Sequence, residues 1–441
     1  MKILATWPPM VPSYFNAGHR LSVYSVAEHL RRNPANEVTA LDLAALNATW
    51  KTIGDVLVLG NYDLVLVAND FDAVDTFART VRYIRTLSPA SRIGTFGRLS
   101  STLPQLFTKF DIDFIGGDGD PEMFASDAVD AISGNQDAIQ RIWSRESGGN
   151  WLRPLPGAHF LPIEQLPLPD VRHIPYAAYD AMYADDTARF CGIPQRRELV
   201  IPIARGCPVN CDFCDIPGRE GLRERRISVD RVIDYIQRSA QHVNFEYVSM
   251  YAPTFTLNKP WVREFCVAYQ HAGIRLPWKC TTTIHHIDDK LTELMASAGC
   301  VRISVGLETL QPEAQEHLPR VKHIELERFT HFAETCQRNG IEVNCFVILG
   351  LPGTTLGGVQ RTIEVAEALG ARIRPTVYTD FSAMRADMSI EEISTFNRQL
   401  LPAHLTESEA HGLYQVLFNP AAKVTAVMSQ IPERQAFNAS A

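Results

Sequence analysis

Short apolar runs alternate with amphipathic helical patterns along two long stretches of this chain, which limits the folds that it can adopt. The first stretch covers about residues 1–135 and the second about residues 196–385. A strand, a helix and a further strand form a βαβ unit, which predicts a parallel sheet with helices on its faces. We therefore expect an α/β protein with a doubly wound, Rossmann-like domain at 1–135 and another parallel unit at 196–385.

The second stretch contains about six strand patterns, each followed by a helix or a crossover. This number is below the eight of a complete barrel of the same parallel build and predicts a partial (β/α)6 barrel. Such barrels carry their chemistry at the carboxyl ends of the strands. Residues 386–441 show helical patterns and are expected to form a short helical C-terminal region that closes the domain.

Residues 136–195 follow a looser pattern. The segment "GNWLRPLPGAHFLPIEQLPLPDVRHIPY" holds six prolines, too many for a helix or a central strand. A proline-rich recognition peptide is one interpretation, but the interleaved Trp, Leu, Phe and Ile residues favour burial. We therefore expect a linker that packs along a domain surface.

Composition excludes several classes of protein. The 441 residues carry a formal net charge of −8, so a surface for sequence-independent nucleic-acid binding is not expected. No run of 18 apolar residues predicts a membrane span. The N-terminus reaches Pro8 and Pro9 before any long apolar run, unlike a secretory signal. We expect a cytoplasmic enzyme, in which nine cysteines are not a disulfide framework.

Three of the cysteines stand out in the segment "RGCPVNCDFCDIP": Cys207, Cys211 and Cys214. Chance would give roughly 0.004 triplets at these two spacings among nine cysteines. Three thiolates can hold an iron–sulfur cluster and leave one iron of a cubane free for another ligand. Structural zinc is the competing interpretation, but it takes four ligands and no second cysteine pair stands nearby. The spacing favours a cluster, with zinc left open.

The CxxxCxxC spacing, the aromatic residue before the last cysteine and the strand in front of the loop resemble the radical S-adenosylmethionine (SAM) superfamily. The resemblance implies a 4Fe–4S cluster on Cys207, Cys211 and Cys214 whose open iron chelates SAM. One electron, from a donor such as flavodoxin or ferredoxin, would then cleave SAM to a 5′-deoxyadenosyl radical that abstracts a substrate hydrogen.

The same resemblance assigns cofactor contacts to residues at the strand ends: Phe213, Ser249, Thr254, Ser304, Glu308 and Gly350. Phe213 and Gly350 would lie by the adenine, and Ser304 and Glu308 would face the ribose and carboxylate. A structural alternative for Ser304 and Glu308 is a helix cap and a surface acid.

An N-terminal doubly wound domain before such a barrel resembles the subgroup with a cobalamin (B12)-binding-type domain. The acidic turn in "KFDIDFIGGDGDPEMF" also resembles that subgroup. No histidine lies between His29 and His159, which excludes an Asp-x-His-x-x-Gly loop with a histidine ligand. Bulky residues at Arg98 and Leu99 replace the usual small turn. Cobalamin binding is therefore left open.

Four polar residues past the third and sixth strands are candidates for substrate handling: His285, His286, Tyr378 and Asp380. Histidine carries protons near neutral pH, although polar loop residues also have structural roles. The arginine-rich segment 218–226 is either a solvated, salt-bridged face or a source of a SAM-carboxylate contact.

Three functions remain. The first is a radical SAM enzyme of natural-product biosynthesis that eliminates water from a small, sugar-like diol, as radical diol dehydratases do. The second is cobalamin-dependent radical methylation of carbon. The third is a non-catalytic iron–sulfur or zinc-binding module. The sequence alone favours the first.

Overall fold

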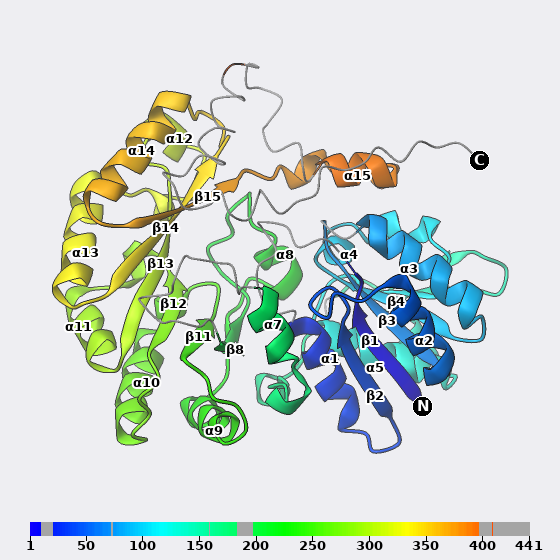
Figure 1. The fold of residues 1–441 in the computed structure, drawn as a ribbon. Helices are drawn as coiled ribbons and strands as arrows, with labels where there is room; N and C mark the ends of the chain where they lie inside the picture. The colour runs from blue at the N-terminus through cyan, green and yellow to red at the C-terminus, as the bar shows by residue number, and fades with distance from the viewer. Residues whose placement is uncertain (10–20, 72–73, 158, 183–196, 397–407, 409–441) are drawn as a thin grey trace.

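Two α/β units lie side by side in the computed structural model (Figure 1). The structure describes residues 1–9, 21–71, 74–157, 159–182, 197–396 and 408. The N-terminal unit is shown in blue and cyan, and the unit containing the cysteine loop in green to orange. The α/β class and the parallel sheets expected from the alternating pattern are confirmed.

The first unit is built on a sheet that, within the described ranges, has seven strands in the order β2-β1-β3-β4-β5-β6-β7. Strands β1 to β5 are parallel to one another, and β6 and β7 extend the β5 edge as antiparallel strands. The strands are β1 (Lys2–Trp7), β2 (Glu37–Asp42), β3 (Leu64–Asn69), β4 (Arg92–Gly97), β5 (Phe114–Ile115), β6 (Trp143–Arg145) and β7 (Trp151–Leu152). The helices are α1 (Leu21–Arg31), α2 (Trp50–Gly60), α3 (Val74–Leu87), α4 (Arg98–Thr102), α5 (Pro121–Ile132) and α6 (Gln136–Ile139).

Helices cover both faces of this sheet. Successive strand residues point to opposite faces, so Ile3 and Leu66 pack with α1 and α5, whereas Leu4 and Val65 pack with α2 and α3. Burial on both faces explains why the central strands are nearly continuous apolar runs. The carboxyl ends of these strands face the second unit.

The first sheet continues beyond residue 135, where the sequence predicts a linker. Strands β6 and β7 extend the sheet to Leu152. The proline-rich segment that follows contributes Leu166, Val171 and Ile174 to the core of the second unit. Residues 183–196 of the predicted linker lie outside the described residues.

The second unit contains a six-stranded parallel sheet in the order β15-β14-β13-β12-β11-β8, counted over the described residues. The strands are β8 (Glu198–Pro202), β11 (Tyr247–Tyr251), β12 (Trp278–Thr282), β13 (Cys300–Glu308), β14 (Glu342–Leu349) and β15 (Arg372–Val377). The helices are α7 (Tyr176–Met182), α8 (Ile216–Glu220), α9 (Val229–Ala240), α10 (Lys259–His271), α11 (Asp289–Ser297), α12 (Pro312–Gln315), α13 (Leu326–Arg338) and α14 (Leu356–Ala368). Sequential strand order with helical crossovers confirms the partial (β/α)6 barrel.

The chain returns to the first unit after β15. Met384, Met388 and Ile393 join the core between the first sheet and α3, and α15 (Ile390–Phe396) crosses toward that unit in Figure 1. Here the expectation that the region from 386 onward closes the barrel is wrong for the described part, because its apolar residues pack on the other unit. Apart from residue 408, the chain beyond 396 lies outside the described residues.

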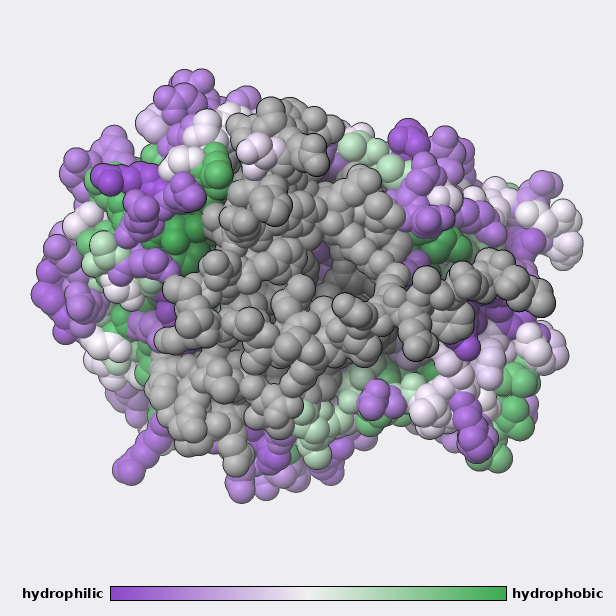
Figure 2. Space-filling view, turned by 45° about the horizontal axis from the view of Figure 1, so that its top comes forward, coloured by the Kyte–Doolittle hydropathy of each residue, from purple (hydrophilic) through white to green (hydrophobic). Residues whose placement is uncertain are grey.

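The described surface is mixed in character. On the face in Figure 2, hydrophilic residues are spread over both units, with apolar residues between them. Among the described helices, none has the length and apolar character that crossing a bilayer requires.

Candidate cluster and cofactor site

A short antiparallel ribbon closes the base of the cysteine loop. Strand β9 (Ala204–Arg205) follows β8 and pairs with β10 (Arg225–Arg226), so the loop projects from the carboxyl end of the first barrel strand. The Cys207 amide donates to the Gly221 carbonyl at 3.0 Å. Gly206 has φ +83, and a Cβ there would lie 2.2 Å from the Arg223 carbonyl oxygen. Only glycine fits this turn, which sets the direction in which Cys207 enters the loop.

The three cysteines of the loop are free thiols at the edge of the protein interior. Cys207 and Cys211 are buried and Cys214 is partly buried. Burial raises the pKa of Cys211 to about 12. The thiol therefore keeps its proton at neutral pH until a bound metal displaces that proton. Among the described residues, no three Cys, His, Asp or Glu side chains converge on one ion. A cubane cluster does not require such convergence, because each cysteine binds a different iron. The donor set fits a cluster.

Phe213 and Gly350 are brought together at the end of β14. The Phe213 ring packs against a small apolar cluster that includes Leu318, Ile348 and Leu351. Gly350 follows β14 directly and has φ +77. This arrangement places an aromatic face and a turn without a side chain next to the cysteine loop. Contact of these two residues with adenine remains a prediction.

Glu308 ends β13 in an unusual setting. It has φ +58, at a register shift between β13 and β14, and its side chain is buried. Its Oε1 accepts a hydrogen bond from Lys322 Nζ at 2.8 Å. Ser304 lies within the strand, where its Oγ accepts from Asn344 Nδ2 at 3.3 Å. The alternative of a helix cap and a surface acid is therefore wrong for both residues.

Ser249 and Thr254 belong to the neighbouring strand end. Ser249 is half-buried within β11, and Thr254 is buried at the start of the short helix η6 (Phe255–Leu257). The Thr254 carbonyl accepts a hydrogen bond from Arg226 Nη2 at 3.2 Å. This contact connects the second strand end to the base of the cysteine loop. The role of both residues in binding SAM stays a prediction.

Three of the four predicted substrate-handling residues make local structural contacts. His285 Nε2 lies 2.8 Å from the His323 carbonyl oxygen, and His286 Nδ1 lies 2.5 Å from Thr283 Oγ1. Burial lowers the pKa of His286. Asp380 caps the turn that follows β15 through the amide and hydroxyl of Ser382. A catalytic role for these three remains a prediction.

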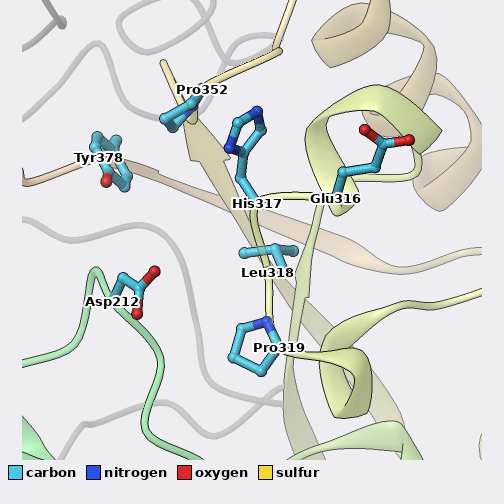
Figure 3. A pocket seen from close by; sticks show the side chains of 7 residues that line it. All are labelled: Asp212, Glu316, His317, Leu318, Pro319, Pro352 and Tyr378. Carbon is cyan, nitrogen blue, oxygen red and sulfur yellow. The ribbon is translucent and has the colours of Figure 1, made fainter.

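The fourth residue, Tyr378, lines a pocket of about 410 Å³ beside the cysteine loop. Figure 3 shows Asp212, His317 and Tyr378 around one space, each from a different segment. Burial, followed by the charges of Asp380 and Asp212, raises the pKa of Tyr378. The lining residues are Asp212, Glu316, His317, Leu318, Pro319, Pro352 and Tyr378. Sequence reasoning missed Asp212 and His317; the position of Asp212 between two cluster cysteines was the available signal.

A buried charge network joins the first unit to the base of the cysteine loop. Arg205 makes two hydrogen bonds of 2.8 Å to Glu122 and an ion pair of 2.8 Å to Asp120. Arg225 pairs with Asp120 at 2.6 Å. The acidic turn and part of the arginine-rich segment thus bind each other. Arg225 has a structural role here, and the segment is more than a solvated face.

A second contact crosses between the units at the other end of the loop. Arg98 Nε donates to Asp215 Oδ2 at 2.7 Å, directly after the last cluster cysteine. The same guanidinium lies 5.0 Å from the Phe71 ring centroid and 5.8 Å from that of Phe381. The end of β4 in the first sheet is therefore in contact with the cysteine loop.

Comparison with known proteins agrees with this architecture. Residues 201–366 match the radical SAM superfamily. An uncharacterized methyltransferase of Pyrococcus horikoshii is 25% identical over 253 residues, which are 57% of this chain and 52% of that protein. The chain thus spans about half the length of this curated relative.

Two solved structures share the fold of both units. The radical SAM methyltransferase TsrM from Kitasatospora setae, solved with tryptophan and a SAM analogue, aligns with a TM-score of 0.69 and 19% identity over 86% of this chain and 74% of its own. The cobalamin-dependent SAM radical enzyme OxsB, with aqua-cobalamin bound, aligns with a TM-score of 0.69 and 16% identity over 89% and 55%. Residues 201–366 of the barrel unit therefore match the radical SAM superfamily, and the fold of the two units together is similar to that of TsrM and OxsB.

Proposed function

We propose that this protein is a cobalamin-dependent radical SAM methyltransferase that acts on a small polar molecule. The sequence alone favours elimination from a diol, but relatives named as methyltransferases favour methylation. The observation that carries the proposal is the contact between the two units. The strand ends of the first unit, through Arg98, meet the cysteine loop of the second at Asp215.

In this proposal Cys207, Cys211 and Cys214 hold a 4Fe–4S cluster. When bound, the cluster and SAM supply one-electron cleavage of SAM, and cobalamin supplies methyl transfer. Phe213 and Gly350 would border the adenine, and Ser304 and Glu308 would face the ribose and the carboxylate of SAM. The partly exposed Cys214 leaves a side of the loop open to a one-electron donor such as flavodoxin or ferredoxin.

The described residues fit a corrinoid that has no histidine ligand. His29 lies on α1, and its Nε2 is 2.9 Å from Ser126 Oγ. Arg98 lies between the first sheet and the cysteine loop, with its guanidinium near the rings of the buried Phe71 and of Phe381. In this proposal Arg98 and Phe381 would border the macrocycle, since a planar guanidinium and an aromatic ring can each pack against a flat group.

The pocket beside Asp212 is the proposed site of the substrate. Its acceptors and its tyrosine suit a substrate that carries hydroxyl or amino groups. Tyr378 keeps its proton at neutral pH, as tyrosine ordinarily does, and burial raises its pKa further, so its hydroxyl can donate a hydrogen bond there. His317 adds an imidazole whose ring nitrogens can donate or accept a hydrogen bond.

The test is performed on protein reconstituted without oxygen, with iron, sulfide and hydroxocobalamin supplied. Iron, sulfide and bound corrinoid are measured first. SAM and dithionite are then added, and S-adenosylhomocysteine and 5′-deoxyadenosine are quantified. Donation of a methyl group leaves S-adenosylhomocysteine, whereas hydrogen abstraction leaves 5′-deoxyadenosine.

About four irons, stoichiometric corrinoid and formation of both products are expected. Cys211→Ala should lose the iron and both products, and Cys266→Ala, at a buried cysteine on α10, serves as the control. 5′-Deoxyadenosine without corrinoid or S-adenosylhomocysteine would reject methylation in favour of elimination. Zinc without iron would reject the cluster itself.

A further inference from the structure

Lys322 is a buried lysine to which neither the sequence motif nor the fold assigns a role. It lies in the turn η8 (Arg320–Lys322), on the segment between α12 and α13. Its side chain is 12% exposed, and the side chain of its partner Glu308 is 6% exposed. Burying a lysine is costly unless the charge is compensated. The burial of this charged pair therefore calls for a functional explanation.

Two backbone features make room for the pair. Gly306 has no side chain, and a Cβ there would lie 2.1 Å from Glu308 Oε1 and 2.5 Å from Lys322 Nζ. Glu308 itself adopts φ +58, an uncommon conformation for a residue other than glycine. A missing side chain and a strained backbone both support the same ion pair. Strain of this kind concentrates at functional sites.

The connection that carries Lys322 also lies against the cysteine loop, because Phe213 packs on Leu318 and because Asp212 lines one pocket with Leu318 and Pro319. Burial raises the pKa of Cys211 and of Cys214, and the positive charge of Lys322 lowers it by a smaller amount. Burial alone would lower the pKa of Lys322, but Glu308 outweighs it and raises that pKa. The lysine therefore keeps its positive charge, in the connection that packs against the cysteine loop.

We propose that Lys322 is a positioning residue of the cluster site, which holds the Glu308 carboxylate in place and stabilises the reduced cluster with its positive charge. The inference rests on the proposed cluster at the three cysteines. Net charge near a cluster is one of the factors that set its reduction potential. An added electron makes the cluster more negative, so a nearby ammonium group favours uptake of that electron from the donor. The reduction of the cluster by dithionite is the one-electron step to be measured.

The experiment measures the midpoint potential of the reconstituted cluster by electron paramagnetic resonance in a dithionite titration, without SAM. Lys322→Met should lower the equilibrium constant for one-electron reduction roughly tenfold, a shift of about 59 mV to more negative potential. Lys322→Arg should keep a value near that of the wild type. The double variant Lys322→Met/Glu308→Gln removes both charges and should return toward the wild-type potential.

Lys279→Met is the matched control. Lys279 forms a 2.8 Å ion pair with Glu198, and both side chains are largely buried. This pair lies near the amino ends of the barrel strands, whereas the cysteine loop follows a carboxyl end. An unchanged midpoint in Lys322→Met, or an equal shift in Lys279→Met, would overturn the inference. If Lys322→Met takes up no iron, the double variant decides: recovery of iron supports the charge argument, and failure contradicts it. Wild-type protein without iron would instead reject the proposed cluster.

Discussion

Replacing Glu122 with glutamine should weaken the contact between the two units. The Glu122 side chain is fully buried at 0% exposure, and both its oxygens lie 2.8 Å from guanidinium nitrogens of Arg205. Removing one partner of a buried ion pair costs about 3–5 kcal/mol, because the other charge stays buried without compensation. Arg205 keeps Asp120 at 2.8 Å. The expected loss is therefore at the lower end, about 3 kcal/mol.

Urea unfolding followed by circular dichroism measures this effect. With a slope of about 3 kcal/mol per molar urea, a loss of about 3 kcal/mol lowers the midpoint by about 1 M. Glu37→Gln is the control, because Glu37 is 73% exposed and lies 3.9 Å from Lys2; exposed pairs of this kind contribute little. An unchanged midpoint in Glu122→Gln, or equal shifts in both variants, would refute the reasoning.

Three further predictions follow from local geometry. Gly206→Ala should reduce the iron bound after reconstitution, because the new Cβ would meet the Arg223 carbonyl at 2.2 Å; iron analysis against Gly218→Ala, where a Cβ meets nothing within 4 Å, checks this. Ser228→Ala should lower the free energy of unfolding by about 1 kcal/mol, since Ser228 caps α9. For Asp113, burial raises the pKa, but hydrogen bonds from a backbone amide and two arginines outweigh it and lower the pKa below 3.8. Its contribution to stability is therefore complete above about pH 4 and is lost as the pH falls through the lowered pKa. Asp113→Asn should destabilise the protein at pH 7 more than at pH 3, as measured by urea unfolding.

The sequence predicts the barrel better than the first unit. Strands buried on both faces are continuous apolar runs, and helices with clear caps, such as α9 after Ser228, separate them. Strand β2 is weaker, because most of its residues are only half-buried at the sheet edge. The helical spacing of apolar residues is obscured in α2, since Val58 and Leu59 are apolar yet exposed. Neither element can be recognised from local pattern alone.

Very short strands form the next limit. Strands β6 and β7 have three and two residues, too few to show any alternation. Strand β6 pairs with the edge that β5 offers, and β7 pairs in turn with β6. A boundary drawn at residue 135 from pattern alone therefore falls before the end of the sheet.

Within the site, the residues that a motif defines could be located from the sequence, and those that depend on the fold could not. The cysteine spacing identifies the loop, and the end of β13 identifies Glu308. Lys322 stands 14 residues after its partner, in a turn whose path depends on the packing of α12. His317 enters the pocket from the same connection. Nothing in their local sequence distinguishes these two residues from other polar loop residues.

The interface between the units shows why this matters for the cysteine loop. Arg205 in β9 and Arg225 in β10 face each other in the ribbon at the base of the loop. Both form ion pairs with Asp120 of the first unit. Without the first unit, two arginines at this base would lose their carboxylates, and their mutual repulsion would act on the ribbon that closes the loop. The acidic turn that resembles a cofactor-domain feature in the sequence is thus also a structural support for the cluster loop. The barrel residues 197–396 alone should therefore bind less iron than the full chain, whatever cofactor the first unit holds.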